Sequence, residues 1–201
     1  MRISPSAIRN AVMDPDYRIS PHSPPAPSTD ASVRKAIREY HAHGSHAAHA
    51  SLESGLSGEY WSAKHGLTKA KIARDLLDTY IHLAAPDKRV AVGSTARTVT
   101  WAGHEIAANI DVLLSDPRGY VGRACLTGVI PRPLDDTDRA LIAAAPLQGL
   151  LKEFEGGDGL FEIIAEIEVW ELRTGTTSVV SRQQAEAAWP RLLQHLQRAI
   201  G

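Results

Sequence analysis

The 201-residue sequence predicts an α/β protein with a mixed sheet flanked by helices. Residues 1–86 are dominated by helical apolar spacing. Residues 89–127 alternate and are rich in Val and Thr, as strands are. Residues 135–201 then return to a helix, two strands and a final helix. A chain of this length suits a single domain, residues 1–201, with one substantial core.

The N-terminal part reads as a short helix followed by a loop. Ser4 can cap a helix and Pro5 is tolerated at its first position, so a helix is expected up to about Met13. Asp14-Pro15 then ends it. The proline- and serine-rich stretch at about 18–30 predicts an extended loop.

Two longer helices are expected next. Asp30 can cap the first, over roughly 31–53, which Gly55 ends. The second begins at about Thr68 and stops at Pro86, with apolar residues recurring at helical spacing.

Three strands follow, at 89–101, 105–115 and 120–127. The last two should form an antiparallel hairpin, because Asp-Pro-Arg-Gly at 116–119 is strong turn chemistry.

The C-terminal third predicts a helix over 135–154, a strand over 160–172 and a short strand ending near Val180. Ser181 and Gln184 have the spacing of a capping box, which begins the last helix.

Composition limits the classes of function. No apolar run is long enough to cross a membrane, and the N-terminus does not read as a secretory signal, so a cytoplasmic protein is expected. A single cysteine excludes an intramolecular disulfide and a four-cysteine metal site. Because the formal net charge is -1, any DNA contact must come from local patches. Seven basic residues have two interpretations, as the lining of a DNA-binding groove or as ordinary solvated surface. They are Lys64, Lys69, Lys71, Arg74, Arg89, Arg97 and Arg118.

The hairpin carries the most informative pattern. Asp111 stands on its first strand, and Thr127-Gly128 ends its second. This layout resembles the central hairpin of the PD-(D/E)XK nucleases, in which the first strand offers an Asp to a metal ion and the second carries an acid and a lysine. Ala124 takes the place of the acid, and Leu126 that of the lysine.

Two earlier segments extend the resemblance to the RecB-like branch, which includes the phage RecE-like exonucleases. Ser4-Pro5-Ser6 and the following Pro15-Asp16-Tyr17 resemble its opening motif, and Asp14 replaces the cysteine that can ligate an iron–sulfur cluster, so no cluster is expected. The run from His49 to Leu52-Glu53 resembles its helix motif of a histidine followed by Leu-Glu.

The resemblance implies a restriction-endonuclease-like fold and a Mg²⁺ or Mn²⁺ ion held by a vestigial His49, by Asp111 and by Glu53 as a further ligand. Each residue has a simpler interpretation: Asp111 as a polar residue at a sheet edge, His49 as an exposed helix histidine, Glu53 as a solvated acid. Zinc binding is disfavoured for the histidine cluster of His41, His43, His46 and His49, because no cysteine or carboxylate stands at zinc spacing.

Glu171-Leu172-Arg173-Thr174-Gly175 offers an alternative catalytic pair, Glu171 and Arg173. Arginine is a poor replacement for a titratable lysine, and the segment follows the intervening helix, which favours an ordinary later strand. The nearby acids Glu162, Glu166 and Glu168 are interpreted as a solvated strand face.

These observations predict a degenerate nuclease-like protein that acts as a non-catalytic or weakly active subunit in DNA processing, recombination or phage defence. Its expected partners are DNA and either another protein or a second copy of the chain, and not a membrane. Two alternatives remain: an active metal-dependent DNA exonuclease that uses His49, Asp111, Glu171 and Arg173, and an assembly protein that does not contact DNA.

Overall fold

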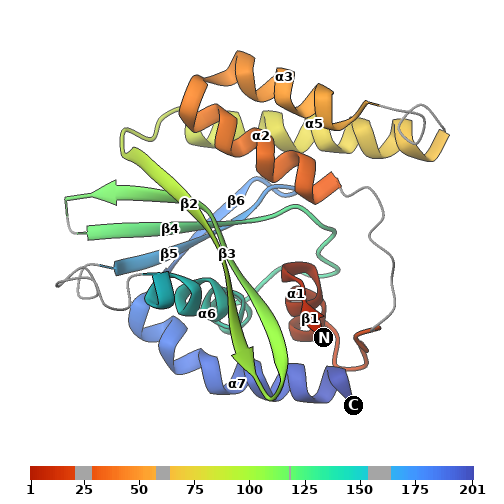
Figure 1. Ribbon diagram of the computed structural model, residues 1–201, viewed down its shortest axis with the longest axis vertical. Helices are drawn as coiled ribbons and strands as arrows, with labels where there is room; N and C mark the ends of the chain where they lie inside the picture. The colour runs from red at the N-terminus through yellow and green to blue at the C-terminus, as the bar shows by residue number, and fades with distance from the viewer. Residues whose placement is uncertain (21–28, 58–63, 118, 154–163) are drawn as a thin grey trace.

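The structure is a computed structural model that describes residues 1–20, 29–57, 64–117, 119–153 and 164–201. It confirms an α/β protein with a mixed sheet between layers of helices (Figure 1). The sheet comprises β1 (Arg2–Ile3), β2 (Val90–Trp101), β3 (His104–Asp116), β4 (Gly119–Leu126), β5 (Ile164–Glu171) and β6 (Thr176–Ser181). The helices of the described residues are α1 (Pro5–Met13), α2 (Thr29–His43), α3 (Ser45–Gly55), α5 (Lys64–Ala84), α6 (Asp136–Glu153) and α7 (Arg182–Ile200).

The strand β3 is the centre of the sheet. The strand β2 pairs with β3 in antiparallel fashion along one edge. The short, parallel β1 and the antiparallel β4 share the other edge of β3. Beyond β4 the order continues with β5, which is parallel to β4, and then with antiparallel β6. The hairpin expected around residues 116–119 is therefore confirmed, with Asp111 on the central strand.

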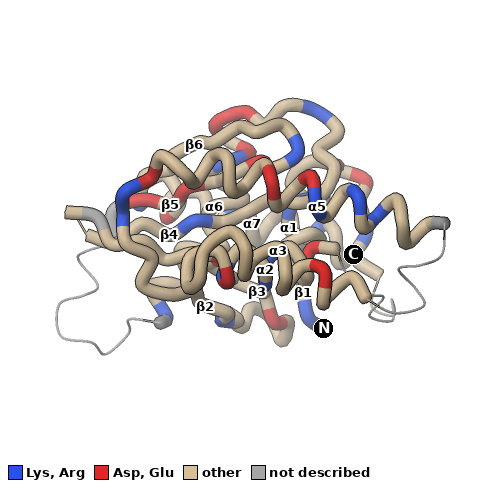
Figure 2. Tube along the Cα trace, turned by 90° about the horizontal axis from the view of Figure 1, so that it is seen from above, with Lys and Arg blue, Asp and Glu red and all other residues tan. Residues whose placement is uncertain are grey.

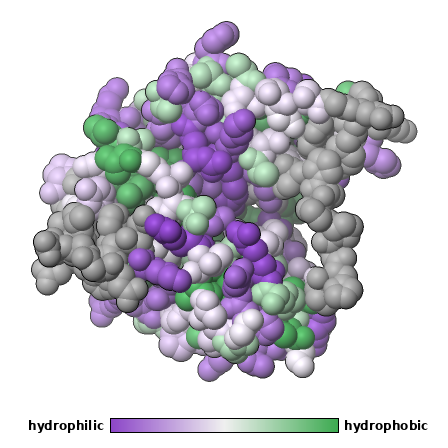
Figure 3. Space-filling model, in the orientation of Figure 1, coloured by the Kyte–Doolittle hydropathy of each residue, from purple (hydrophilic) through white to green (hydrophobic). Residues whose placement is uncertain are grey.

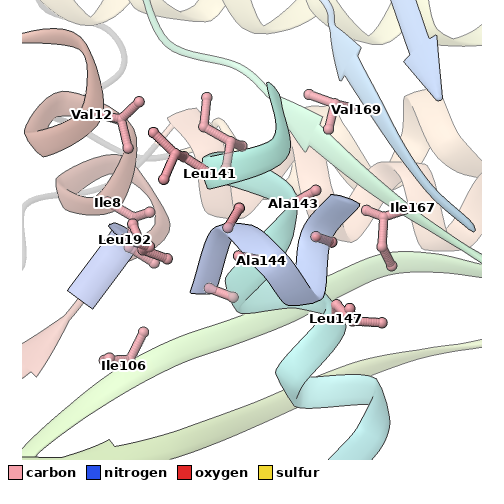
Figure 4. Packing of buried hydrophobic residues seen from close by; sticks show 14 of the residues in the cluster. Ile8, Val12, Ile106, Leu141, Ala143, Ala144, Leu147, Ile167, Val169 and Leu192 are labelled. Atoms are coloured by element: carbon pink, nitrogen blue, oxygen red, sulfur yellow. The ribbon is translucent and has the colours of Figure 1, made fainter. Parts of the chain in front are cut away.

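Two apolar cores cover the two faces of the sheet. The helices α1, α6 and α7 pack on one face, where Ile106, Ile167 and Leu192 are buried together (Figure 4). The helices α2, α3 and α5 pack on the other, around Leu77 and Tyr80. The helix α6 approaches β3 so closely that a Cβ on Gly149 would lie 2.2 Å from the Ala108 carbonyl oxygen, so this crossing requires glycine.

Local signals set most helix ends as expected. The Ser4 hydroxyl accepts a hydrogen bond from the Ala7 amide at 3.2 Å and begins α1. The capping box between Ser181 and Gln184 is present at the start of α7.

Two expectations about the chain before residue 90 need revision, and parts of two others lie outside the described residues. The single helix predicted over 31–53 is wrong: Gly44 adopts a φ of +87° and separates α2 from α3. The helix α5 begins at Lys64 rather than Thr68, because a helix tolerates a glycine such as Gly66 at modest cost. The central part of the loop expected at about 18–30 lies outside the described residues, as does the start of the strand expected at 160.

The prediction that Glu168 belongs to a solvated face is wrong. Its side chain is buried because the paired residue on β4 is Arg123, a fully buried cation that Glu168 neutralises. Glu166 is half-buried and Glu162 lies outside the described residues. No helix in the described part of the chain is long and apolar enough to cross a membrane.

Candidate functional site

Asp111 lies where the pairing of β3 with β2 is irregular and its pairing with β4 has ended. The four residues of β3 from Ile110 to Leu113 lie opposite only three residues of β2, from Thr95 to Gly93, so β3 bulges at this point. The pairing of β3 with β4 stops at Val112. Only 2% of the Asp111 side chain is exposed, and its Oδ2 accepts a hydrogen bond from the Cys125 amide at 2.7 Å. The carboxylate therefore bridges the two strands of the hairpin where the ladder ends.

Arg34 of α2 neutralises this carboxylate. Its Nη1 donates to both oxygens of Asp111, and its Nη2 donates to the Cys125 carbonyl at 2.8 Å. Burial opposes the charge of the guanidinium, but the charge and hydrogen bond of Asp111, together with contributions from Cys125 and Asp30, outweigh burial and raise the pKa of Arg34. Asp111 and Arg34 thus form an ion pair with further backbone hydrogen bonds.

Ala124 and Leu126, at which the nuclease pattern would have an acid and a lysine, lie beside the same guanidinium. Arg34 lines a small cavity of about 30 Å³ with Asn109, Ala124 and Leu126. Ala124 and Leu126 carry no polar side-chain atom, and the buried Asn109 Oδ1 has no hydrogen-bond partner. The charged groups in this part of the hairpin are consequently Asp111 and the arginine that binds it.

A larger cavity of about 280 Å³ opens on the other side of Asp111. The helix α2 contributes Arg38 and His41 to its lining, and the bulged part of β2 contributes Gly93 and Ser94. Arg38 is exposed and has no ion-pair or hydrogen-bond partner among the described residues. Hydrophilic residues gather in the middle of the molecular face drawn in Figure 3. The cavity therefore offers an unpaired guanidinium next to a carboxylate that is already neutralised.

His41 is a residue that sequence reasoning noticed only as part of a histidine cluster. Its Nε2 lies 2.6 Å from the hydroxyl oxygen of Tyr80 on α5. Burial, and then the positive charge of Arg123, lower the pKa of His41 to about 4. The imidazole is therefore neutral at physiological pH, and the local sequence carries no signal of this.

A buried ion network lies behind Tyr80. The Arg123 guanidinium is fully buried, and it donates to Glu168 at 2.8 Å, to Asp87 at 2.6 Å and to the Tyr80 hydroxyl at 3.1 Å. It also stacks on the Trp170 ring, 3.6 Å from the ring centroid.

Arg89 completes this network. It contacts Asp87 at 2.9 Å and Glu168 at 2.5 Å, so two cations face two carboxylates. Burial opposes the ionised form of Asp87, but hydrogen bonds from Arg89 and Arg123 outweigh it and lower its pKa. The two positive and two negative charges of this network balance, and the network joins the segment after α5 to β4 and β5.

The structure does not place His49 or Glu53 with Asp111. His49 lies on α3, half exposed, with its Nε2 3.6 Å from Asp78 of α5. Glu53 receives two hydrogen bonds from Arg74 of α5, at 2.6 and 2.8 Å. Neither residue lines either cavity at Asp111. Both residues have carboxylate or guanidinium partners on the neighbouring helix.

Glu171 and Arg173, at the end of β5, also have partners of their own. Glu171 is buried, and its Oε1 lies 3.7 Å from a guanidinium nitrogen of Arg139. Burial raises the pKa of Glu171, although the charge of Arg139 opposes the shift. Arg173 donates from Nε to the Thr127 carbonyl at 3.1 Å. No described contact joins this pair to Asp111.

Three of the seven basic residues that were considered for a DNA groove pair with acids. Arg74, Lys71 and Arg89 each pair with an acid, while Arg118 and the side chain of Lys64 lie outside the described residues. Acidic and basic residues are interspersed along the chain (Figure 2). Across the described ranges, no three His, Cys, Asp or Glu side chains gather where they could hold a metal ion.

No model of a known protein family matches the sequence, and a comparison with curated proteins gives no significant match.

Proposed function

We propose that this protein is a degenerate PD-(D/E)XK nuclease-like protein that binds DNA without cleaving it, as a non-catalytic subunit in DNA processing, recombination or phage defence. The observation that carries the proposal is the ion pair between Arg34 and Asp111. In the family that the hairpin resembles, the corresponding carboxylate holds a metal ion. In this chain a guanidinium contacts both of its oxygens.

The donor set around Asp111 does not fit a magnesium or manganese ion. Such an ion takes about six oxygen ligands, and the protein must fix several of them. The Asp111 oxygens accept bonds from Arg34 and Cys125, while Ala124 and Leu126 supply no ligand. His49 and Glu53 are bound to residues of α5. These contacts favour loss of catalysis over the alternative of an active exonuclease.

The positive charge beside the hairpin favours DNA binding. Arg38 presents an unpaired cation in the cavity beside Asp111, and no described acid neutralises it. Backbone phosphates of DNA are bound by such guanidinium groups. A neutral pair at Asp111 also removes the repulsion that a free carboxylate would exert on a phosphate.

The proposal is tested by measuring DNA binding in the presence of EDTA. The full chain should bind linear DNA with the metal chelated, since arginine supplies the positive charge, and Arg38→Ala should weaken binding by about threefold to tenfold. Lys71→Ala, which removes a surface cation already paired with Asp75, serves as the control. Absence of DNA binding would favour the assembly protein that contacts no DNA.

A further inference from the structure

A second group of arginines lies at the carboxyl end of β4, just beyond Leu126, which lines the smaller cavity. Arg9 of α1 lies directly against Gly128: a Cβ on that glycine would be 1.7 Å from the Arg9 Nη1. Its hydrogen bonds to described residues both go to the neighbouring Asn10 Oδ1, at 3.1 and 2.7 Å. The glycine thus leaves room for a guanidinium that has no acidic partner in contact.

Arg173 lies two residues beyond the end of β5. Its Nε donates to the carbonyl of Thr127, the residue before Gly128. The two guanidinium groups therefore contact adjacent residues of the chain, which brings the two cations near each other. Burial lowers the pKa of Arg9; Asp30 and Tyr17 oppose the shift, and the positive charge of Arg173 adds to it. In the part of the chain that the structure describes, neither has a carboxylate within 4.0 Å.

This arrangement is unfavourable unless something else compensates it. Burial costs the Arg9 guanidinium hydration, and Asp30 offsets this cost only from beyond 4.0 Å, while a second cation nearby adds to it. Thr127, whose carbonyl binds Arg173, is 2% exposed, and its hydroxyl has no hydrogen-bond partner in the described part of the chain. A water molecule would satisfy the hydroxyl but would bring no counterion into contact with the arginines. An anion would supply both an acceptor and a counterion.

The position in the fold is one at which α/β proteins bind ligands. The strands β4 and β5 are parallel, and both Thr127 and Arg173 follow their carboxyl ends. In open α/β sheets, ligands bind beyond this end of the strands.

We propose that Arg9, Arg173 and Thr127 form a binding site for a phosphate group. Planar guanidinium forks match phosphate oxygens in pairs, and a phosphate carries enough charge and acceptors for two arginines and a hydroxyl. A carboxylate has only two oxygens and one charge. The phosphate belongs either to a nucleic-acid strand or to a small phosphorylated molecule. The site does not use Asp111, so it goes beyond the proposed function and does not depend on it.

The test is calorimetric titration of the full chain with two probes, inorganic phosphate and a short single-stranded oligonucleotide. We expect phosphate to bind with a Kd of about 1 mM or tighter. Arg9→Ala and Arg173→Ala should each weaken binding by about tenfold or more, since each removes a charge-assisted hydrogen bond. Gly128→Ala should do the same by displacing the Arg9 guanidinium without removing its charge. Arg191→Ala, an exposed arginine on α7, is the control.

The two probes distinguish the source of the phosphate. If the three variants weaken oligonucleotide binding as well, the site takes the phosphate of a strand; if they weaken only phosphate binding, it takes that of a small molecule. Arg173 is exposed, so its removal leaves the core intact and keeps the test valid if Arg9→Ala fails to fold. The proposal is overturned if Arg173→Ala and Gly128→Ala bind both probes as tightly as the control variant does.

Discussion

Arg34 and Asp111 come from elements far apart in the chain, separated by 77 residues, and meet at the point where the hairpin ladder ends. The carboxylate is almost fully buried, whereas 16% of the guanidinium is exposed. A buried carboxylate without a cation is costly, so either an arginine or a metal ion must stand beside it. In this chain the arginine has that role.

Removing Arg34 should therefore cost more than an ordinary surface substitution. We expect Arg34→Ala to lower the free energy of unfolding by about 3 kcal/mol, because it leaves Asp111 buried and unpaired. Lys35→Ala, at the adjacent exposed position, should change it by less than about 0.5 kcal/mol. Urea denaturation of both variants measures the difference. Equal stability of the two would show that the ion pair does not hold the hairpin.

Single-residue predictions from sequence succeed where the signal is local. The strand pattern and the turn at residues 116–119 place Asp111 on the central strand. Its partner could not be predicted, because nothing in residues 31–38 distinguishes Arg34 from the other basic residues of α2. The prediction of a solvated Glu168 fails for a related reason. Alternation shows which face a side chain points to, but it does not show that Arg123 is buried on that face.

At the scale of elements, the contact between His41 and Tyr80 joins α2 to α5 and, through Arg123, to β4. These helices form the layer that carries Arg34 and Arg38. The end of α2 was not predicted, because the left-handed backbone of Gly44 divides a stretch that periodicity alone predicts as one helix. A positive φ is not visible in an apolar pattern.

This contact predicts a dependence of stability on pH. His41 has a pKa of about 4 in the folded protein and 6.5 as the ordinary value. Between those values the unfolded chain binds a proton that folded His41 does not. The His41 contribution to the free energy of unfolding is therefore fully present above about pH 6.5 and decreases as the pH drops towards 4. The slope from this group is at most about 1.4 kcal/mol per pH unit.

Urea denaturation across this range, for the wild type and His41→Gln, measures that slope. The variant should lose the His41 contribution, whereas His43→Gln, on the exposed side of α2, should retain it. Identical pH dependence in all three proteins would contradict a neutral, half-buried His41.

The whole molecule is a sheet covered on both faces, with Asp111 and its two cavities between α1, α2 and the central hairpin. The α/β class and the order of the elements followed from periodicity and turn chemistry. The separation of His49, Glu53, Glu171 and Arg173 from Asp111 did not, because it depends on which side chains pair across elements.

The most direct test of the account is metal-dependent cleavage of linear DNA by the purified chain. With Mg²⁺ or Mn²⁺, the wild type should cleave no faster than Asp111→Ala, because the carboxylate is bound by Arg34 and no second acid or lysine stands beside it. Each missing electrostatic group commonly costs ~10²–10³ in rate. Metal-dependent cleavage by the wild type that disappears in Asp111→Ala would contradict the account.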